Sequence, residues 1–312
     1  MKTSHAVSCM VGGCMAVTRK AVHETQEQRV SHPAIAPNHA AVITGGASGI
    51  GLAAAMRFAG FGMKVCIADL GGHRLKEAEA KLVSVASGGA ADIMAAAVDV
   101  SRIEQVAELE GAVRARFGGI DVLMNNAGIQ PGSTMFGPLA NWQRVLGVNL
   151  WGIIHGSQIF APQMIARGRP GLIINTGSKQ GITTPPGDPA YNVSKAGVKA
   201  FTEALQHELR NTAGSKISAH LFIPGHVFTA LTARGRTEKP AGAWTPEQTV
   251  DFMIERVGAG DFYILCPDND VPRRLDERRM LWAAGDIVEN RPALSRWHPD
   301  HAEAFARFVE GK

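Results

Sequence analysis

The sequence predicts an α/β fold in which one parallel sheet of about seven strands carries helices on both faces. From residue 39 onward, short apolar or β-branched runs alternate with longer segments of helical periodicity, which is the pattern of successive βαβ units. Several of these runs are apolar almost throughout, as strands covered on both faces should be. The predicted strands are residues 40–44, 64–69, 93–100, 121–126, 172–176, 217–223 and 261–266.

Helical periodicity fills the intervals between these strands. The segment before the last strand begins with Thr245, Pro246 and Gln248, which together predict a capping box with proline at the first helical position. Residues 234–244 lack periodicity and contain glycine and proline, so we expect a flexible lid there. The predicted helices are residues 49–60, 73–86, 101–117, 138–167, 191–212 and 246–257.

The chain divides into three parts. Residues 1–38 are expected to form a disordered N-terminal extension, because the apolar stretch after Lys2 is too short and too interrupted for an export signal. Residues 39–269 form one doubly wound Rossmann domain, and residues 270–312 form a C-terminal helical extension packed on that domain. Two helices are expected in this extension, VPRRLDERRMLWAAGDIVEN and DHAEAFARFVE, with the RLDERR charges in solvent and Trp282 and Trp297 packed on the sheet. The extension could instead cover an active-site mouth or reach a neighbouring subunit.

Composition excludes several classes of protein. Of the 312 residues, 45% are hydrophobic and 19% charged, which fits a folded globular chain. The net charge of +4 comes from scattered Lys and Arg residues, so no nucleic acid partner is predicted. No continuous run of about 18 apolar residues is present, so no transmembrane helix is predicted. Cys66 and Cys266 lie in predicted strands and no CxxC pair occurs, which favours a reducing cytoplasmic location without disulfides, and no metal site is predicted.

A glycine cluster lies where the first strand meets its helix. In the stretch AVITGGASGIG, Gly45, Gly49 and Gly51 permit a tight turn that lets the backbone approach a pyrophosphate at the helix N-terminus. Their spacing, G-x-x-x-G-x-G, matches the general dinucleotide fingerprint only loosely. The alternative is a turn that merely needs positive φ.

Asp69 ends the second predicted strand. Its carboxylate could accept hydrogen bonds from the ribose hydroxyls of adenosine and would repel a 2′-phosphate. Neither Ser48 nor Leu70 supplies a cation for such a phosphate, although Arg74 lies near. NAD is therefore predicted over NADP, the alternative being that Asp69 is an ordinary strand-end aspartate.

Tyr191 and Lys195 are four residues apart in a predicted helix, so their side chains share one face. A free tyrosine has a pKa of about 10 and is a poor base at neutral pH. A lysine ammonium and a cationic nicotinamide would both favour the phenolate. Such a pair could take a proton from an alcohol while hydride leaves the same carbon, although the spacing alone is common by chance.

A set of short motifs resembles the short-chain dehydrogenase/reductase family over residues 39–230. The motifs occur in that family's order and each falls on the expected element. They are TGGASGIG (44–51), NNAG (125–128), Asn149 in the long helix, Ser178 in SKQG, YNVSK (191–195) and PGHVFT (224–229).

The resemblance implies four catalytic residues. Tyr191 would be the general acid/base, and Lys195 would lower the tyrosine pKa and hold the nicotinamide ribose. Ser178 would hydrogen-bond the reacting oxygen, with a strand-end cap as the alternative. Asn149 would help to hold a water in a proton path to the lysine.

The resemblance also implies a set of cofactor-binding residues. They follow the pyrophosphate, the adenosine and then the nicotinamide: Gly45, Ser48, Gly49, Ile50 and Gly51; Asp69, Leu70, Asp99, Val100, Asn126, Ala127 and Gly128; Tyr191, Lys195, Pro224, Gly225, Val227 and Thr229.

The substrate pocket is predicted from residues that flank these motifs or lie in the lid. Lys179 is expected to point to solvent, although it could meet an acidic substrate, and His226 is expected to be a spacer. The pocket would be mostly apolar with a few amides, favouring a medium-sized hydrophobic alcohol or ketone over a charged sugar. The predicted substrate-binding residues are Ser178, Gln180, Tyr191, Phe228 and Trp244, with Ile129, Gln130, Pro186 and Met253 as further candidates.

The function predicted from these observations is an NAD(H)-dependent oxidoreductase that interconverts a secondary alcohol and a ketone. Two alternatives stay open, which are a reductase of a C=N or enoyl bond on the same scaffold and a dinucleotide-binding redox sensor or scaffold. The presence of Ser178, Tyr191 and Lys195 together speaks against the sensor. The resemblance further implies a homodimer or homotetramer.

Overall fold

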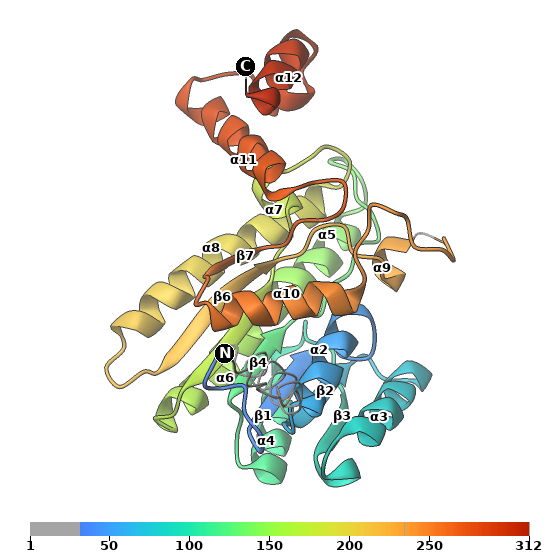
Figure 1. The fold of residues 1–312 in the computed structure, drawn as a ribbon, viewed down its shortest axis with the longest axis vertical. Coiled ribbons are helices and arrows are strands. Elements are labelled where there is room, and N and C mark those ends of the chain that lie inside the picture. The colour runs from blue at the N-terminus through green and yellow to red at the C-terminus, as the bar shows by residue number, and fades with distance from the viewer. Residues whose placement is uncertain (1–31, 234, 312) are drawn as a thin grey trace, which may run out of the picture.

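The computed structural model describes residues 32–233 and 235–311. Its seven strands form one parallel sheet in the order β3-β2-β1-β4-β5-β6-β7, which confirms the predicted fold class (Figure 1). The strands are β1 (Ala40–Thr44), β2 (Lys64–Asp69), β3 (Ile93–Ala97), β4 (Val122–Asn125), β5 (Gly171–Thr176), β6 (Ile217–Ile223) and β7 (Tyr263–Leu265).

Helices cover both faces of this sheet. The larger ones are α2 (Gly49–Gly60), α3 (His73–Val85), α4 (Ile103–Phe117), α5 (Leu139–Leu146), α6 (Gly152–Ala166), α8 (Pro189–Asn211) and α10 (Pro246–Gly258). Two short helices, α7 (Gln180–Thr183) and α9 (Ala230–Ala233), follow β5 and β6, and α11 (Arg273–Val288) and α12 (Ala302–Glu310) end the chain. The capping box predicted at Thr245 is present at the start of α10.

The two faces hold separate hydrophobic clusters. Ala41 and Ile43 of β1 pack with α2, α3 and α10, whereas Ala40 and Val42 pack with α4, α6 and α8. This alternation follows from the pleat, which directs successive side chains to opposite faces. The sheet is therefore covered on both sides, as the nearly continuous apolar strands required.

The third strand is shorter than predicted, because it ends at Ala97 and not at residue 100. The Asp99 carboxylate accepts hydrogen bonds from the backbone N–H and the hydroxyl of Ser101, at 2.9 and 2.7 Å. This local turn draws Asp99 and Val100 out of the sheet and places them at its carboxyl edge. The fifth predicted helix, at 191–212, conversely starts two residues early, since Pro189 provides a favourable first position.

The long predicted helix at 138–167 is divided. Residues Gly147–Trp151 form one π-helical turn between α5 and α6, and Asn149 lies at its centre with no exposed surface. Single π-helical turns inside α-helices occur frequently at functional sites. Here the wider turn presents the Asn149 carboxamide to the loop after β4.

Residues 32–38 contact the domain, although the sequence assigned them to the extension. Ala34 and Ile35 are buried and join the cluster beneath α2 and α10, because two apolar side chains cover the edge of that cluster. The prediction of disorder for residues 1–31 lies outside the described residues.

The C-terminal helices do not pack as predicted. Trp282 of α11 is buried against Phe305 and Phe308 of α12 at centroid distances of 5.4 and 5.3 Å, not against the sheet. Its indole N–H donates to the Ser295 hydroxyl at 2.7 Å. The extension thus has a small core of its own and extends beyond the sheet, next to α7 (Figure 1). The division of the chain into a domain and an extension remains a prediction.

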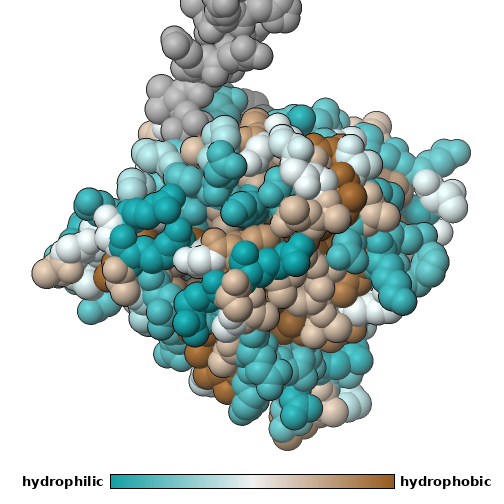
Figure 2. Space-filling model, turned by 90° about the horizontal axis from the view of Figure 1, so that it is seen from below, coloured by the Kyte–Doolittle hydropathy of each residue, from teal (hydrophilic) through white to brown (hydrophobic). Residues whose placement is uncertain are grey.

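Hydrophilic and hydrophobic side chains are interspersed over the face at the lower end of Figure 1, far from α11 and α12 (Figure 2). Among the described residues, no helix combines the length and the apolar character needed to cross a membrane.

Candidate active site

A cavity of about 430 Å³ lies at the carboxyl ends of the strands, where the strand order reverses between β1 and β4. Ligands bind at this switch point in open α/β sheets. Every residue predicted to bind the cofactor lines this cavity except Gly51. The structure therefore brings together residues that the sequence spreads from position 45 to position 229.

The glycine turn forms one end of the cavity. Gly45 has φ of +65°, and a Cβ added there would lie 2.8 Å from the Cα of Ala127. Gly49 has φ of +52°, and its Cβ would lie 3.1 Å from the Thr229 side chain. Gly51 lies behind the turn, where a Cβ would collide with the carbonyl oxygen of Gly45. Only glycines allow this close backbone approach, which suits the pyrophosphate of a dinucleotide.

Asp69 closes the adenosine end. Its carboxylate accepts hydrogen bonds from the backbone N–H groups of Ala47 at 3.0 Å and Leu70 at 2.8 Å. These bonds hold the acid against the glycine turn, where ribose hydroxyls could reach it. Arg74 also lines the cavity, and among the described lining residues it is the cation near that end that could meet a 2′-phosphate.

Tyr191 lies at the opposite end, in the first turn of α8, with its side chain almost fully buried. Burial raises the pKa of Tyr191, a hydrogen bond with the Ser178 hydroxyl lowers it, and the nearby charge of Asp188 raises it. The net pKa lies above the ordinary tyrosine value. A positive charge next to the ring would lower this pKa.

Lys195 lies one turn further along α8. Its ammonium donates a hydrogen bond to the carbonyl oxygen of Thr176 at 2.8 Å and lies 5.8 Å from the centre of the Tyr191 ring. Burial lowers the pKa of Lys195 to about 8. Thr176 fixes the ammonium between the tyrosine and the cavity, a role that the sequence did not reveal.

Asn149 holds the loop that borders the site. Its carboxamide oxygen accepts from the N–H of Ile129 at 2.8 Å, and its nitrogen donates to the Ile129 carbonyl at 2.9 Å and to the Ser194 hydroxyl at 3.3 Å. Asn149 itself does not line the cavity, but its oxygen lies near the Lys195 ammonium across Gly128. Its contacts thus join the π-helical turn to α8 and to the loop after β4.

A second cavity of about 430 Å³ opens beside Ser178 and Tyr191. The Ser178 hydroxyl accepts from the N–H of Gln180 at 3.2 Å. No aspartate or glutamate is among the described residues that line this cavity. They are Gln130, Ser178, Lys179, Gln180, Tyr191, Pro224, Gly225, His226, Thr232 and Arg236.

Four of the residues predicted for the pocket line neither cavity, namely Phe228, Trp244, Pro186 and Met253. Trp244 packs on Phe252 at 5.7 Å, and its indole N–H donates to the Asn269 side chain at 3.0 Å. Phe228 is held beside it, because the Phe228 N–H donates to the Trp244 carbonyl at 2.9 Å. Trp244 is partly buried against the hydrophobic cluster beneath α2 and α10. Arg236 lines the cavity instead, and the absence of periodicity in residues 234–244 gave no signal for it.

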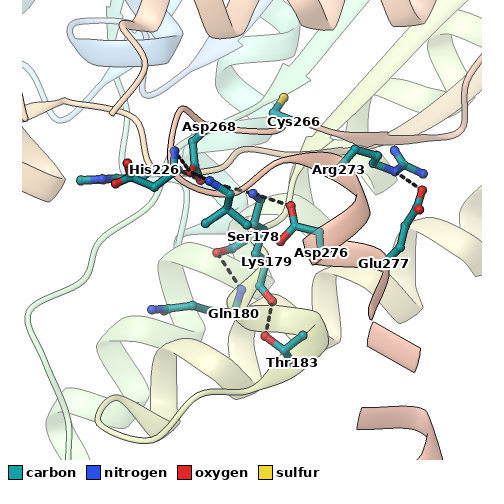
Figure 3. Close-up of polar contacts among 12 residues, drawn as sticks. Ser178, Lys179, Gln180, Thr183, His226, Cys266, Asp268, Arg273, Asp276 and Glu277 are labelled. Carbon is teal, nitrogen blue, oxygen red and sulfur yellow. Dashed lines mark hydrogen bonds and ion pairs between the residues drawn. The ribbon is translucent and has the colours of Figure 1, made fainter. Parts of the chain in front are cut away.

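The expectation that Lys179 points to solvent is wrong. Its ammonium forms ion pairs with Asp268 at 3.3 Å and with Asp276 at 2.6 Å (Figure 3). The two carboxylates come from the turn after β7 and from α11, so no local sequence pattern could indicate them. Asp276 is likewise buried, although it belongs to the RLDERR segment that was expected in solvent. His226 lines the second cavity, and its backbone N–H donates to Asp268 at 3.1 Å.

The comparisons with known proteins agree with this geometry. A model of the short chain dehydrogenase family matches residues 39–240. The chain is 31% identical to a 1-deoxy-11-beta-hydroxypentalenate dehydrogenase of Streptomyces exfoliatus, over 83% of this chain and 94% of that protein. It is also 31% identical to a D-beta-hydroxybutyrate dehydrogenase of Rhizobium meliloti, over 70% of this chain and 81% of that protein.

A similar solved structure is a short chain dehydrogenase/reductase from Burkholderia phymatum in complex with NAD. It has a TM-score of 0.73 and 30% sequence identity, and the match covers 83% of this chain and 96% of that one. The chain belongs to the short-chain dehydrogenase/reductase family, a family of oxidoreductases that bind a nicotinamide dinucleotide. Within the described part of the chain, no group of three or more His, Cys, Asp or Glu side chains is arranged to hold a metal ion.

Proposed function

We propose that the protein is an NAD(H)-dependent oxidoreductase that interconverts a secondary alcohol and a ketone, with Tyr191 as the general acid/base. The observation that carries the proposal is the continuity of the site. The glycine turn and Asp69 lie at one end of the first cavity, and Ser178, Tyr191 and Lys195 lie at the other, where the second cavity begins. A dinucleotide bound along the first cavity would present its nicotinamide end to a substrate in the second.

The dinucleotide and each side chain of the site have separate roles in the proposed reaction. The bound dinucleotide supplies the hydride acceptor or donor and, when oxidised, a positive charge. Ser178 donates a hydrogen bond to the reacting oxygen and orients it toward Tyr191. Tyr191 takes the hydroxyl proton of an alcohol, or returns it to a ketone oxygen. Lys195, fixed by the Thr176 carbonyl, stabilises the phenolate and would reach the nicotinamide ribose.

The preference for NAD rests on Asp69. A carboxylate held on the glycine turn favours free ribose hydroxyls and repels a phosphate. The NAD complex of the Burkholderia phymatum protein supports this choice for a related chain. Arg74 is the competing feature, since a guanidinium pairs well with phosphate.

The lining of the second cavity favours a substrate that carries an acidic group. Arg236 lines it without an ion-pair partner among the described residues, whereas Lys179 is already paired with two carboxylates. Gln130 and Gln180 lie side by side, 3.4 Å apart through their amides, and offer further hydrogen bonds. This lining is more polar than the hydrophobic pocket expected from the sequence. Two related enzymes are named for hydroxy acids, a hydroxypentalenate and a hydroxybutyrate.

The proposal is tested with a panel of secondary alcohols and ketones, presented as matched acids and methyl esters, with NAD and NADP at equal concentration. Absorbance of the reduced nicotinamide reports turnover. We expect turnover with NAD, and higher kcat/KM for acids than for their esters. A protein that binds NADH but turns over no member of the panel would instead support the sensor alternative.

A further inference from the structure

The segment after β5 meets the turn after β7 and the start of α11 at one buried charge cluster, formed by Lys179, Asp268 and Asp276 (Figure 3). The ammonium of Lys179 lies 3.3 Å from the Asp268 carboxylate and 2.6 Å from that of Asp276. The side chain of Lys179 is 19% exposed and those of the two aspartates are 5% exposed. Surface ion pairs contribute little to stability, but removing one partner of a buried ion pair is strongly destabilising, because it leaves a buried charge unpaired.

The cluster is joined directly to Ser178. Lys179 is the next residue, and its carbonyl accepts hydrogen bonds from the N–H groups of Ile182 and Thr183, both at 3.1 Å, at the start of α7. The N–H of Gln180 donates to the Ser178 hydroxyl at 3.2 Å. A displacement of Lys179 would therefore move the hydroxyl that orients the reacting oxygen.

The cluster is also joined to the loop proposed to meet the nicotinamide. The Asp268 carboxylate accepts the N–H of His226 at 3.1 Å. It lies so close to Gly225 that a Cβ on that glycine would be 2.8 Å from the carboxylate oxygen. Its other oxygen accepts the N–H groups of Asp270 and Val271, at 3.2 and 2.8 Å, in the turn that leads to α11.

The third partner belongs to the C-terminal extension. Asp276 lies in the first turn of α11, and Trp282 further along this helix is buried against α12. The position of Asp276 is thus set by a helix with its own small core. Lys179 connects that helix to both sides of the reaction site.

We propose that Lys179, Asp268 and Asp276 are positioning residues through which the C-terminal extension sets the placement of Ser178 relative to the nicotinamide loop. The inference rests on the proposed function for the roles of Ser178 and of residues 224–229. It makes the extension a working part of the active site and not an appendage.

The test variant is Asp276→Asn in the full chain, because it removes one charge while keeping the size of the side chain. The matched control is Glu277→Gln, on the same helix, where the exposed Glu277 pairs only with Arg273 at 2.8 Å. Hydrogen exchange followed by mass spectrometry is measured for both variants and the wild type. We expect faster exchange in peptides covering residues 178–183 and 224–229 for Asp276→Asn alone.

Steady-state kinetics give a second readout on the same variants. Misplacing an orienting group by a fraction of an ångström lowers the rate more than ground-state binding, so kcat should fall about tenfold in Asp276→Asn while KM for NAD changes by less than about twofold. Lys179→Arg, which keeps the positive charge, should retain kcat within about threefold. Glu277→Gln should match the wild type.

Two results would overturn the inference. If Asp276→Asn speeds exchange only in α11 and α12, the cluster merely anchors the extension. If kcat is unchanged while the two loops exchange faster, their placement does not limit the reaction. A wild-type enzyme without alcohol turnover would refute the proposed function, whereas the exchange experiment would still report whether the loops are coupled.

Discussion

The cofactor side and the substrate side of the site are built in opposite ways. Backbone geometry dominates the cofactor side, where Gly45 and Gly49 have positive φ. The Thr44 hydroxyl there accepts hydrogen bonds from the backbone N–H groups of Asn126 and Ala127, at 2.9 and 3.1 Å. Charged and polar side chains dominate the substrate side. They come from the segments after β5, β6 and β7 and from α11.

This difference explains why the cofactor side can be recognised from a local sequence pattern and the substrate side cannot. A tight turn at a fixed distance from a strand can be made by few residue types, so it leaves a local pattern. A salt bridge such as that between Lys179 and Asp276 needs only opposite charges that meet in space. Small steric changes should therefore disrupt the cofactor side, whereas loss of a charge should disrupt the substrate side.

On the cofactor side, the largest expected effect is that of Gly45→Ala. The new Cβ would lie 2.8 Å from the Ala127 backbone at a φ of +65°, so the turn must move. We expect the Kd for NADH, measured by fluorescence titration, to rise by about 100-fold, which corresponds to about 3 kcal/mol. Gly60→Ala is the control, because a Cβ there meets nothing within 4 Å. Equal affinity in the two variants would contradict the close backbone approach.

Asp69→Asn tests the same side by charge instead of by shape. The amide oxygen can still accept a hydrogen bond, but the repulsion of a 2′-phosphate is lost. We expect the ratio of kcat/KM with NAD to that with NADP to fall about tenfold, a change of about 1.4 kcal/mol. A wild-type enzyme that prefers NADP would show that Arg74 outweighs Asp69.

On the substrate side, Arg236→Gln should weaken turnover of acidic substrates selectively. A charge-assisted hydrogen bond at a partly open site contributes about 1 kcal/mol, so kcat/KM should fall about fivefold for an acid and stay unchanged for its methyl ester. Lys239→Gln removes a charge from the same segment, where the ammonium bonds the Ala243 carbonyl at 2.8 Å. An equal loss in both variants would point to the overall charge of the segment and not to Arg236.

The last expected effect concerns the stability of the fold and not the site. Burial and the neighbouring His220 lower the pKa of His32 to about 4. The unfolded chain therefore binds more protons between pH 6.5 and pH 4, and stability should fall as the pH decreases through that window. Because His32 is partly exposed, we expect a loss of about 1–2 kcal/mol. Urea unfolding at pH 7 and pH 4.5 should show a smaller difference for His32→Gln than for the wild type.

Local sequence patterns predicted most of the fold. The alternation of apolar runs and helical segments placed all seven strands, and the errors lie at element ends that side chains decide. The hydrogen bonds of Asp99 to Ser101 end β3 early, and the π-helical turn at Asn149 divides the long helix. Neither feature has a periodicity that could be read in advance.

The same distinction holds for the site. The catalytic and cofactor-binding residues predicted from the motifs line one cavity except for Gly51 and Asn149, whereas much of the substrate wall was misjudged. Phe228 and Trp244 line neither cavity, and Lys179 pairs with Asp268 and Asp276, which lie far away in sequence. Arg236 lies outside every motif found in the sequence. Side chains that act through tertiary contacts need the folded structure to be recognised.

The most direct test of the central claim is a comparison of Tyr191→Phe with Tyr263→Phe, the only two tyrosine substitutions that the sequence allows. Tyr263 is half exposed on β7, far from the cavity, and donates to Glu203. The measurement is single-turnover reduction of NAD by a responsive alcohol at saturating cofactor. Loss of the proton acceptor should slow Tyr191→Phe by about 10²–10⁴-fold and leave Tyr263→Phe unchanged. Undiminished turnover in Tyr191→Phe would contradict the assignment of Tyr191 as the general acid/base.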